Sequence, residues 1–265
     1  MDYNSILISA LIGGVSIGGA VGIGELLKKA APDRFHQIIT YGAIAVGVTV
    51  MTLAYNWHRG YRLQAEVETL IADDELFQLI KIEFPAEYQA AMTKVRTGEE
   101  GGKIGAELTS GIRKTYAEDL RASSVDLLRR WNDVEVELIK SILELRGWER
   151  CNRYLAEGAP SIQGSHPRFN TSIQDLSLVV LEALVDGQRG SSRRGAATEE
   201  DWASFIEYWN AEGATDQDLE RVVNFDPNNE KTCASVISYL GAASRFEGAA
   251  ADQILTELAI IRASS

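Results

Sequence analysis

Two long apolar runs without a charged residue dominate the first part of the chain. The first run covers residues 3–24 and the second covers residues 38–57, and the polar segment ELLKKAAPDRFHQ separates them. An α-helix rises about 1.5 Å per residue, so each run can cross a hydrocarbon core about 30 Å thick. The pattern predicts a transmembrane helical hairpin over residues 1–57, with helices at about 3–27 and 34–60.

Small residues recur at every fourth position of the first run, at Ala10, Gly14, Gly18 and Gly22. Four residues make about one helical turn, so these positions form one stripe along which a second helix can approach closely. The second run has small positions of its own, at Gly42, Ala43 and Gly47. This glycine zipper predicts packing of the two helices of one hairpin, and self-association of several copies.

Aromatic and basic residues mark the far end of the second run, at Tyr55, Trp57, Arg59, Tyr61 and Arg62. Such residues are enriched at the headgroup level of membranes, so we expect a membrane interface here. The basic residues of the connection, Lys28, Lys29 and Arg34, lean towards a connection in the cytoplasm and a domain outside. The acidic, cysteine-poor composition of the domain leans the other way, and we expect a cytoplasmic domain.

Three other interpretations of the apolar runs fit less well. A signal peptide has a basic start and a cleavage site, whereas this chain begins with Asp2. A dinucleotide-binding turn requires G-x-G-x-x-G, and Leu27 stands where the last glycine would be. A buried hairpin of a soluble protein explains one apolar run more easily than two.

The remaining residues, 58–265, have apolar positions at helical spacing and no convincing strand-like alternation. The fold class is therefore all-α, with the hairpin followed by an acidic multi-helix domain. Phe84 and Pro85 separate two of its helices, because the residue before a proline avoids the helical region. The longest predicted helix covers residues 124–156, with an interruption at Gly147.

Glycine, proline and serine mark the breaks in the second half of the domain. Gly158, Pro160, Gly164 and Pro167 suggest a sub-boundary near residues 158–170, and the segment QRGSSRRGAAT predicts a flexible loop over residues 187–198. Thr198 and Thr215 each precede acidic residues, which is typical of a helix N-terminus.

The net charge of −12 resides entirely in residues 58–265, which carry 35 acidic and 23 basic side chains. An acidic surface repels phosphates, so nucleic acid is not an expected partner. Cys151 and Cys233 are too few and too far apart for a disulfide framework or a metal pattern. One bridge is compatible with the sequence, but two buried free thiols are the favoured interpretation.

No arrangement of residues typical of a catalytic or metal site is apparent. His36, His58 and His166 lack partners at metal-ligand spacing, and Asp226 begins a segment in which Lys231 replaces the glycine of a calcium loop. We therefore predict no cofactor and no metal, and we do not expect an enzyme.

Two groups of residues are candidate contacts for a partner protein. Arg189, Arg193 and Arg194 form a basic loop in an acidic domain that could meet an acidic partner or anionic lipid, although a disordered surface loop is the favoured interpretation. Trp202, Phe205 and Trp209 lie on one helical face, for which core packing is the default interpretation and protein binding is the alternative.

Together these patterns predict a non-enzymatic, multi-pass membrane protein with two transmembrane helices. The expected partners are the lipid bilayer, further copies of the chain and an unknown protein that the helical domain recruits or regulates. The alternative is a homo-oligomeric pore or a membrane-disrupting protein. A membrane-tethered enzyme is a third class, for which the sequence offers no catalytic residues.

Overall fold

The computed structural model describes residues 49, 51–52, 58–69, 71–99, 101–162, 166–248 and 250–264. Within these ranges the chain contains helices and no strand, which confirms the all-α prediction. The predicted hairpin lies outside the described residues, apart from residues 49, 51 and 52 and the last residues of its second helix. None of the described helices is both long and apolar enough to span a membrane.

The described elements are α3 (Glu75–Glu83), α4 (Pro85–Thr97), α5 (Gly101–Tyr116), the 3-10 helix η1 (Ala117–Ala122), α6 (Val125–Glu157), the 3-10 helix η2 (Ala159–Ser161), α7 (Pro167–Arg189), α8 (Glu199–Ala211), α9 (Asp216–Val223), α10 (Thr232–Arg245) and α11 (Ala251–Ser264). Residues 58–69 are also helical. The chain divides into two compact units, Met1–Ala72 with Gln89–Ile104 and Asp73–Tyr88 with Gly105–Ser265.

Within the first unit, the helix of residues 58–69 contacts the last part of α4. The guanidinium of Arg96 lies 5.3 Å from the ring centroid of Tyr61. Its Nη1 donates to the Tyr61 hydroxyl at 3.4 Å, and its Nη2 donates to Oγ1 of Thr93 at 2.9 Å. A cation over an aromatic ring contributes about 0.5–1 kcal/mol at an exposed site.

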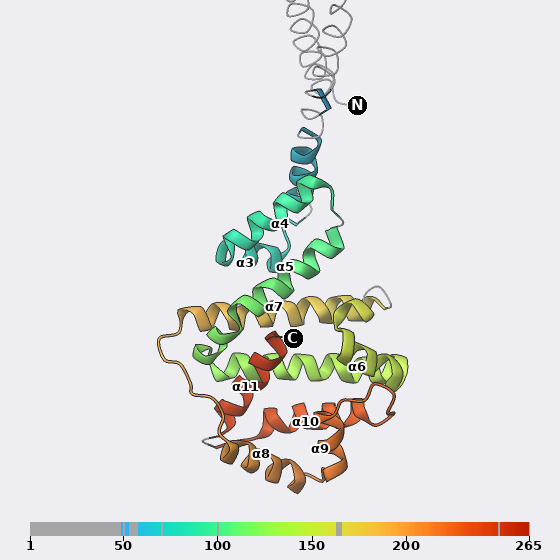
Figure 1. Cartoon of the computed structure of the whole chain (residues 1–265), viewed down its shortest axis with the longest axis vertical. Helices are drawn as coiled ribbons and strands as arrows, with labels where there is room; N and C mark the ends of the chain where they lie inside the picture. The colour runs from blue at the N-terminus through green and yellow to red at the C-terminus, as the bar shows by residue number, and fades with distance from the viewer. Residues whose placement is uncertain are drawn as a thin grey trace, which may run out of the picture. The chain divides into compact units, whose positions relative to one another are not determined.

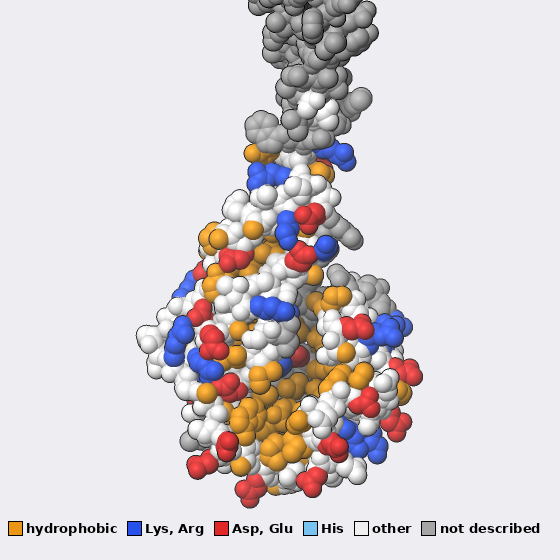
Figure 2. Space-filling view, viewed as in Figure 1, with side chains coloured by type: hydrophobic (Ala, Val, Ile, Leu, Met, Phe, Trp, Pro, Cys, Tyr) orange, Lys and Arg blue, Asp and Glu red, His pale blue; other side chains and the backbone are white. Residues whose placement is uncertain are grey.

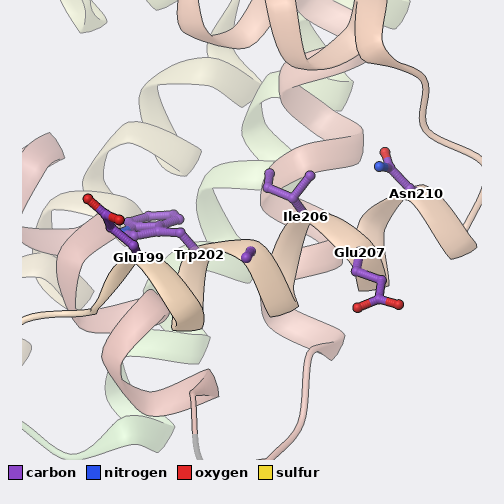
Figure 3. Close-up of a pocket in the computed structure, with 6 residues that line it drawn as sticks. Glu199, Trp202, Ile206, Glu207 and Asn210 are labelled. Carbon is purple, nitrogen blue, oxygen red and sulfur yellow. The ribbon is translucent and has the colours of Figure 1, made fainter.

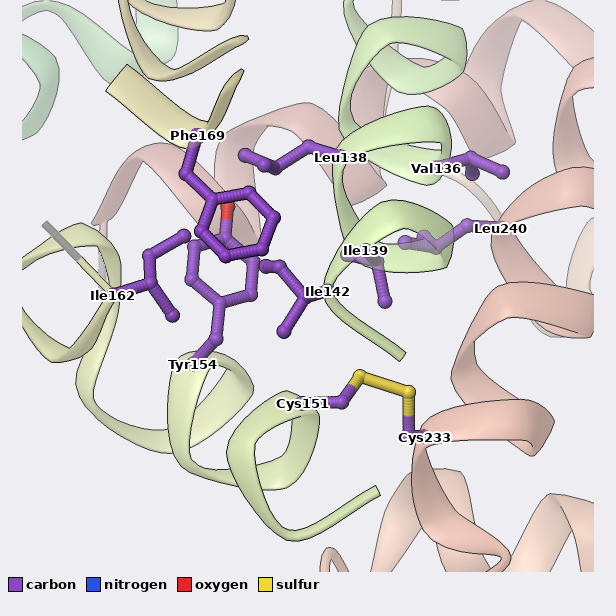
Figure 4. Packing of buried hydrophobic residues seen from close by; sticks show 10 residues of the cluster. All are labelled: Val136, Leu138, Ile139, Ile142, Cys151, Tyr154, Ile162, Phe169, Cys233 and Leu240. Atoms are coloured by element: carbon purple, nitrogen blue, oxygen red, sulfur yellow. A yellow bond between two sulfur atoms is a disulfide. The ribbon is translucent and has the colours of Figure 1, made fainter. Parts of the chain in front are cut away.

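The second unit is built around α6, which has α7 along one side and α10 along the other (Figure 1). The C-terminal helix α11 packs on α6 and η1 and also contacts α8. The core between these helices contains Leu138, Ile142 and Phe169, none of which is more than 1% exposed (Figure 4). Burial of such side chains stabilises the fold by about 1.5–3 kcal/mol each.

The predicted interruption of the longest helix is confirmed at Gly147. Its φ of 78° lies in the left-handed region, which glycine adopts readily and other residues avoid. The kink divides α6 into residues 125–146 and 148–157. The second segment carries Cys151 and Tyr154 into the core.

The end of α7 approaches the backbone of η1 at two glycines. A Cβ at Gly187 would lie 2.2 Å from the carbonyl oxygen of Asp119, and a Cβ at Gly190 would lie 2.3 Å from that of Ala122. Both distances are far below van der Waals contact, so only glycine fits at either position. These contacts fix the point at which the chain leaves α7.

Helix starts were predicted well where the N-cap is a threonine. Thr198 and Thr215 each form a capping box, with Asp201 and Asp218 three residues later. α5 begins at Gly101, and α7 begins at Pro167, within the expected sub-boundary at residues 158–170, with His166 as its N-cap.

Candidate functional site

The predicted membrane residues lie mostly outside the described part of the chain. This holds for the glycine zipper and for Tyr55 and Trp57, so their roles stay predictions. Three residues of the predicted interface are described: Arg59 is exposed, Tyr61 is 45% exposed, and Arg62 lies 3.6 Å from Glu66.

The three candidate arginines all have acceptors inside the second unit. Arg189 pairs with Glu83 at 2.6 Å and Arg193 pairs with Asp119 at 2.7 Å. Residues 190–198, which we call the arginine strap, have no regular secondary structure but are held by specific hydrogen bonds. The predicted flexible loop therefore corresponds to the end of α7 followed by an ordered connection.

Arg194 makes the most extensive contacts of the arginine strap. Its Nε donates to Oγ1 of Thr256 at 2.7 Å, and its Nη2 donates to the carbonyl oxygens of Leu120, at 3.1 Å, and Ser123. Burial lowers the pKa of Arg194 below its ordinary value, while the charges of Asp252 and Asp186 act in the opposite direction. Because its guanidinium is occupied by these acceptors, Arg194 joins η1 to α11.

The ion pair between Arg121 and Glu257 also holds the arginine strap. Nη1 of Arg121 lies 2.7 Å from Oε1 of Glu257, and both side chains are less than one fifth exposed. The hydrogen bond to Glu257 is the main cause of the raised pKa of Arg121. The same Glu257 oxygen accepts from the backbone N–H of Ala197 at 3.3 Å. The strap is thus bound at both Arg194 and Ala197.

The prediction of two free thiols is wrong, because Cys151 and Cys233 form a disulfide between α6 and α10 (Figure 4). Both residues are 0% exposed, and their Cα atoms are 6.0 Å apart. The kink at Gly147 turns the last segment of α6 so that Cys151 faces α10. The spacing of 82 residues contained no sign of this contact.

Two buried asparagines were not predicted, and both hold distant backbone. Nδ2 of Asn132 donates to the carbonyl of Leu240 at 2.6 Å, which joins α6 to α10. Nδ2 of Asn152 donates to the carbonyls of Pro227, at 3.0 Å, and Asn229, at 2.8 Å. The sequence signal for this role would have been an asparagine on the apolar face of a predicted helix.

The side chains of Asp226 and His166 accept hydrogen bonds from nearby backbone N–H groups. Oδ1 of Asp226 accepts from the N–H of Asn228, and Nδ1 of His166 accepts from the N–H of Arg168. Within the described ranges, no three His, Cys, Asp or Glu side chains come together as metal ligands.

The aromatic candidates on α8 separate into a buried and a partly exposed set. Phe205 and Trp209 are 0% exposed, and Nε1 of Trp209 donates to Oγ of Ser238 on α10 at 2.9 Å. Tyr239 contacts both rings edge-on, with centroid distances of 5.1 and 5.0 Å. Phe205 and Trp209 therefore hold α8 in place, whereas Trp202 remains partly accessible.

The outer side of α8 contains a shallow hollow of about 630 Å³. Its lining residues are Glu199, Trp202, Ala203, Ile206, Glu207 and Asn210 (Figure 3). Trp202 and Ile206 form its apolar walls, and Glu199 lies beside the indole of Trp202. A concave apolar surface with a few polar groups at its edge is typical of a binding site.

The two charged residues that line this hollow, Glu199 and Glu207, are both acidic. Residues 195–220 contain eight acidic side chains and no Lys, Arg or His. Figure 2 shows hydrophobic side chains gathered over the region of α8, α10 and α11, with both acidic and basic side chains around them. The surface therefore fits an apolar ligand that carries positive charge at its edges.

Together, these features define a disulfide-linked helical domain with an acidic, partly apolar surface helix. Comparisons with known proteins return no match to a family model, to a curated protein or to a solved structure.

Proposed function

We propose that the chain is a membrane-anchored, self-associating protein whose helical domain binds a protein partner. The anchor is the hairpin predicted from the two uncharged runs, and the self-association surface is the stripe of Ala10, Gly14, Gly18 and Gly22. The stripe and nearly all of the hairpin lie outside the described residues, so both rest on the sequence pattern.

The observation that carries partner binding is the hollow on α8. Most polar and aromatic side chains of α8 and its neighbours have structural partners, as the capping box of Thr198 and the contacts of Trp209 illustrate. Trp202, Ala203 and Ile206 instead line an open surface. Exposed apolar surface with a polar rim is characteristic of protein–protein interaction sites.

The buried disulfide is relevant to the question of which side of the membrane the domain occupies. Structural disulfides form in oxidising compartments and are rare in the cytosol. The Cys151–Cys233 bond therefore supports a domain outside the cytoplasm, although composition alone favoured the cytoplasm. This orientation agrees with a cytoplasmic connection that contains Lys28, Lys29 and Arg34.

The anchor is tested by washing membranes that contain the full chain with alkaline carbonate. We expect the protein to remain in the membrane pellet, and recovery in the soluble fraction would contradict the hairpin. The mass of the detergent-solubilised protein, measured by light scattering with detergent subtracted, then tests self-association. A single defined oligomer is expected, whereas a monomer would remove this part of the proposal.

A matched pair of variants tests the role of the glycine zipper. Gly18→Leu adds a large side chain on the stripe, and Ala20→Leu adds one on the opposite side of the predicted helix. We expect the first variant to reduce the oligomer mass and the second to leave it unchanged. Equal effects would show that the stripe is not the assembly surface.

The pore alternative is distinguished by reconstituting the same oligomer into vesicles loaded with a small fluorescent dye. An anchor that presents a binding domain should leave the vesicles sealed. Dye release that grows with the number of subunits per vesicle would favour the pore.

A further inference from the structure

The hollow on α8 has the geometry of two successive sites for the side chains of a second helix. Residues at positions i, i+3, i+4 and i+7 of a helix surround a hole that receives one side chain of a packed helix. Glu199, Trp202, Ala203 and Ile206 form one such set, and Ala203, Ile206, Glu207 and Asn210 form the next. All six lining residues belong to these two sets.

The two holes differ from an ordinary solvated helix face in their apolar content. Trp202 and Ile206 are partly buried and provide the walls, whereas Ala203 belongs to both holes and is small and exposed. A small residue at this position allows the backbone of a second helix to come close. Since the holes are offset by four residues, the matching side chains are one helical turn apart.

The buried side of α8 makes this surface a rigid platform. Phe205 and Trp209 are fully buried, and Trp209 is hydrogen-bonded to Ser238 on α10. The capping box between Thr198 and Asp201 fixes the first turn. A preorganised site loses little conformational entropy when a ligand binds, which favours affinity.

The surrounding charge selects among the possible occupants. Glu199 and Glu207 line the hollow and no Lys, Arg or His does, which favours a cationic ligand and disfavours anionic lipid or nucleic acid. A second copy of the same face would bring Glu199 and Glu207 close to the equivalent carboxylates, which is unfavourable. The complementary occupant is a helix with apolar residues on one side and Lys or Arg beside them.

We propose that the outer face of α8 docks a basic amphipathic helix of a partner protein. Two apolar side chains of that helix, one turn apart, enter the holes on either side of Ala203. Its flanking cations lie near Glu199 and Glu207. This inference rests on the proposed function, because it gives the chemistry of the partner that the helical domain binds.

The test uses three labelled synthetic helices of 20 residues and the full chain in neutral detergent. The first peptide has leucines four residues apart and flanking lysines in an alanine background. The second replaces the lysines by glutamates, and the third replaces the leucines by serines. In fluorescence anisotropy titrations we expect the first peptide to bind at least about tenfold more tightly than either control.

Two matched pairs of variants locate the binding site on α8. Ala203→Leu fills both holes, whereas Ser204→Leu adds a similar side chain at an exposed position that does not line the hollow. Glu207→Lys reverses a charge at the hollow, and Glu200→Lys makes the same change outside it. We expect about a tenfold loss of peptide affinity for Ala203→Leu and Glu207→Lys and less than a twofold change for their controls. Circular dichroism confirms that each variant is folded.

Several outcomes would overturn the inference. One is equal affinity of the Leu/Lys peptide for wild type and Ala203→Leu, and another is the absence of any binding by that peptide. A lower oligomer mass of Ala203→Leu would identify a second copy as the occupant. Loss of binding to anionic phosphatidylserine vesicles in this variant would identify lipid.

A failure at α8 can be distinguished from a failure of the proposed function. Carbonate extraction and oligomer mass do not depend on the outer face of α8, so they test the anchor separately. If the peptide fails to bind while a natural partner is mapped to another face of the helical domain, the docking inference is wrong and the proposed function stands.

Discussion

Nε of Arg194 donates to Oγ1 of Thr256 at 2.7 Å, and the same hydroxyl donates to the backbone carbonyl of Asp252 at 2.6 Å. This relay ties the arginine strap to α11. The strap leads directly into α8, so the contact also positions the first residue of the candidate binding face. An arginine that the sequence marked as a surface contact is therefore a structural link.

Replacement of Arg194 should destabilise the second unit much more than replacement of its neighbour. Arg194→Met removes the hydrogen-bond donors to Thr256, Leu120 and Ser123. Each buried acceptor that is left without a partner destabilises the fold by about 1–3 kcal/mol. We expect a loss of about 2–3 kcal/mol in the free energy of unfolding, measured by urea denaturation.

Arg193→Met is the matched control for this experiment. Arg193 is 59% exposed and pairs with Asp119, and exposed ion pairs contribute about 0–1 kcal/mol. Equal destabilisation by the two variants would show that the Arg194 contacts are not the main support of the strap.

The disulfide should contribute strongly to stability. It joins residues 82 positions apart, and closure of such a loop in the unfolded chain corresponds to about 4.5 kcal/mol in the chain-entropy model. The double variant Cys151→Ala with Cys233→Ala should lose a large part of this free energy of unfolding. A loss below about 1 kcal/mol would contradict this account.

The state of the two cysteines in cells also tests the orientation of the domain. Cells are lysed in denaturant with a maleimide–polyethylene glycol reagent, and each free thiol then raises the apparent mass on a gel. We expect no increase before reduction and two increments after it, because the chain has two cysteines. Two increments before reduction would contradict both the bond and a domain on the oxidising side.

Gly187 should be intolerant of any side chain. A Cβ there would overlap the carbonyl of Asp119 at 2.2 Å, so Gly187→Ala requires α7 to move away from η1. We expect a loss of about 1–3 kcal/mol in thermal or urea unfolding, as for other overpacked sites. Gly195→Ala is the control, because no atom lies within 4 Å of a Cβ at that position. A similar loss for both variants would mean that the close approach is unimportant.

Features that depend on a few neighbouring residues were predictable from the sequence. The start of α8 at Thr198 depends on a hydroxyl and a carboxylate three residues apart, and the kink at Gly147 depends on one glycine in an apolar helix. Both signals are local, so they need no knowledge of the tertiary structure. The N-terminus of α7 at Pro167 lies within the break expected at residues 158–170, although a proline at the first helical position is itself a local signal.

Features that depend on distant residues were not predictable in this way. Arg194 contacts Thr256 across 62 positions, and Cys151 meets Cys233 across 82. Glycine, serine and arginine in QRGSSRR indicate a loop, but whether the loop is ordered depends on acceptors supplied by η1 and α11. The same holds for Phe205 and Trp209, whose burial depends on the packing of α8 against α10.

Asp218 should make the stability of α9 depend on acidic pH. Its carboxylate accepts from the hydroxyls of Thr215 and Ser235, both at 2.7 Å, and pairs with Arg221 at 2.9 Å. The hydrogen bonds to Thr215 and Ser235 are the main causes that hold the pKa of Asp218 below its ordinary value of 3.8. A carboxyl with a lowered pKa in the folded state stabilises the fold above its unfolded pKa.

This stabilisation is fully present near neutral pH and is lost as the pH falls below about 3.8, through the lowered pKa of the folded state. Asp218→Asn should therefore reduce stability at pH 7 and have a smaller effect in strong acid, when urea unfolding is followed from pH 7 to pH 2. Asp216→Asn removes a charge from the same first turn of α9 and serves as the control. The two proteins could instead differ by the same free energy of unfolding at every pH in this range. That result would show that the negative charge of Asp218 does not hold α9 to α10.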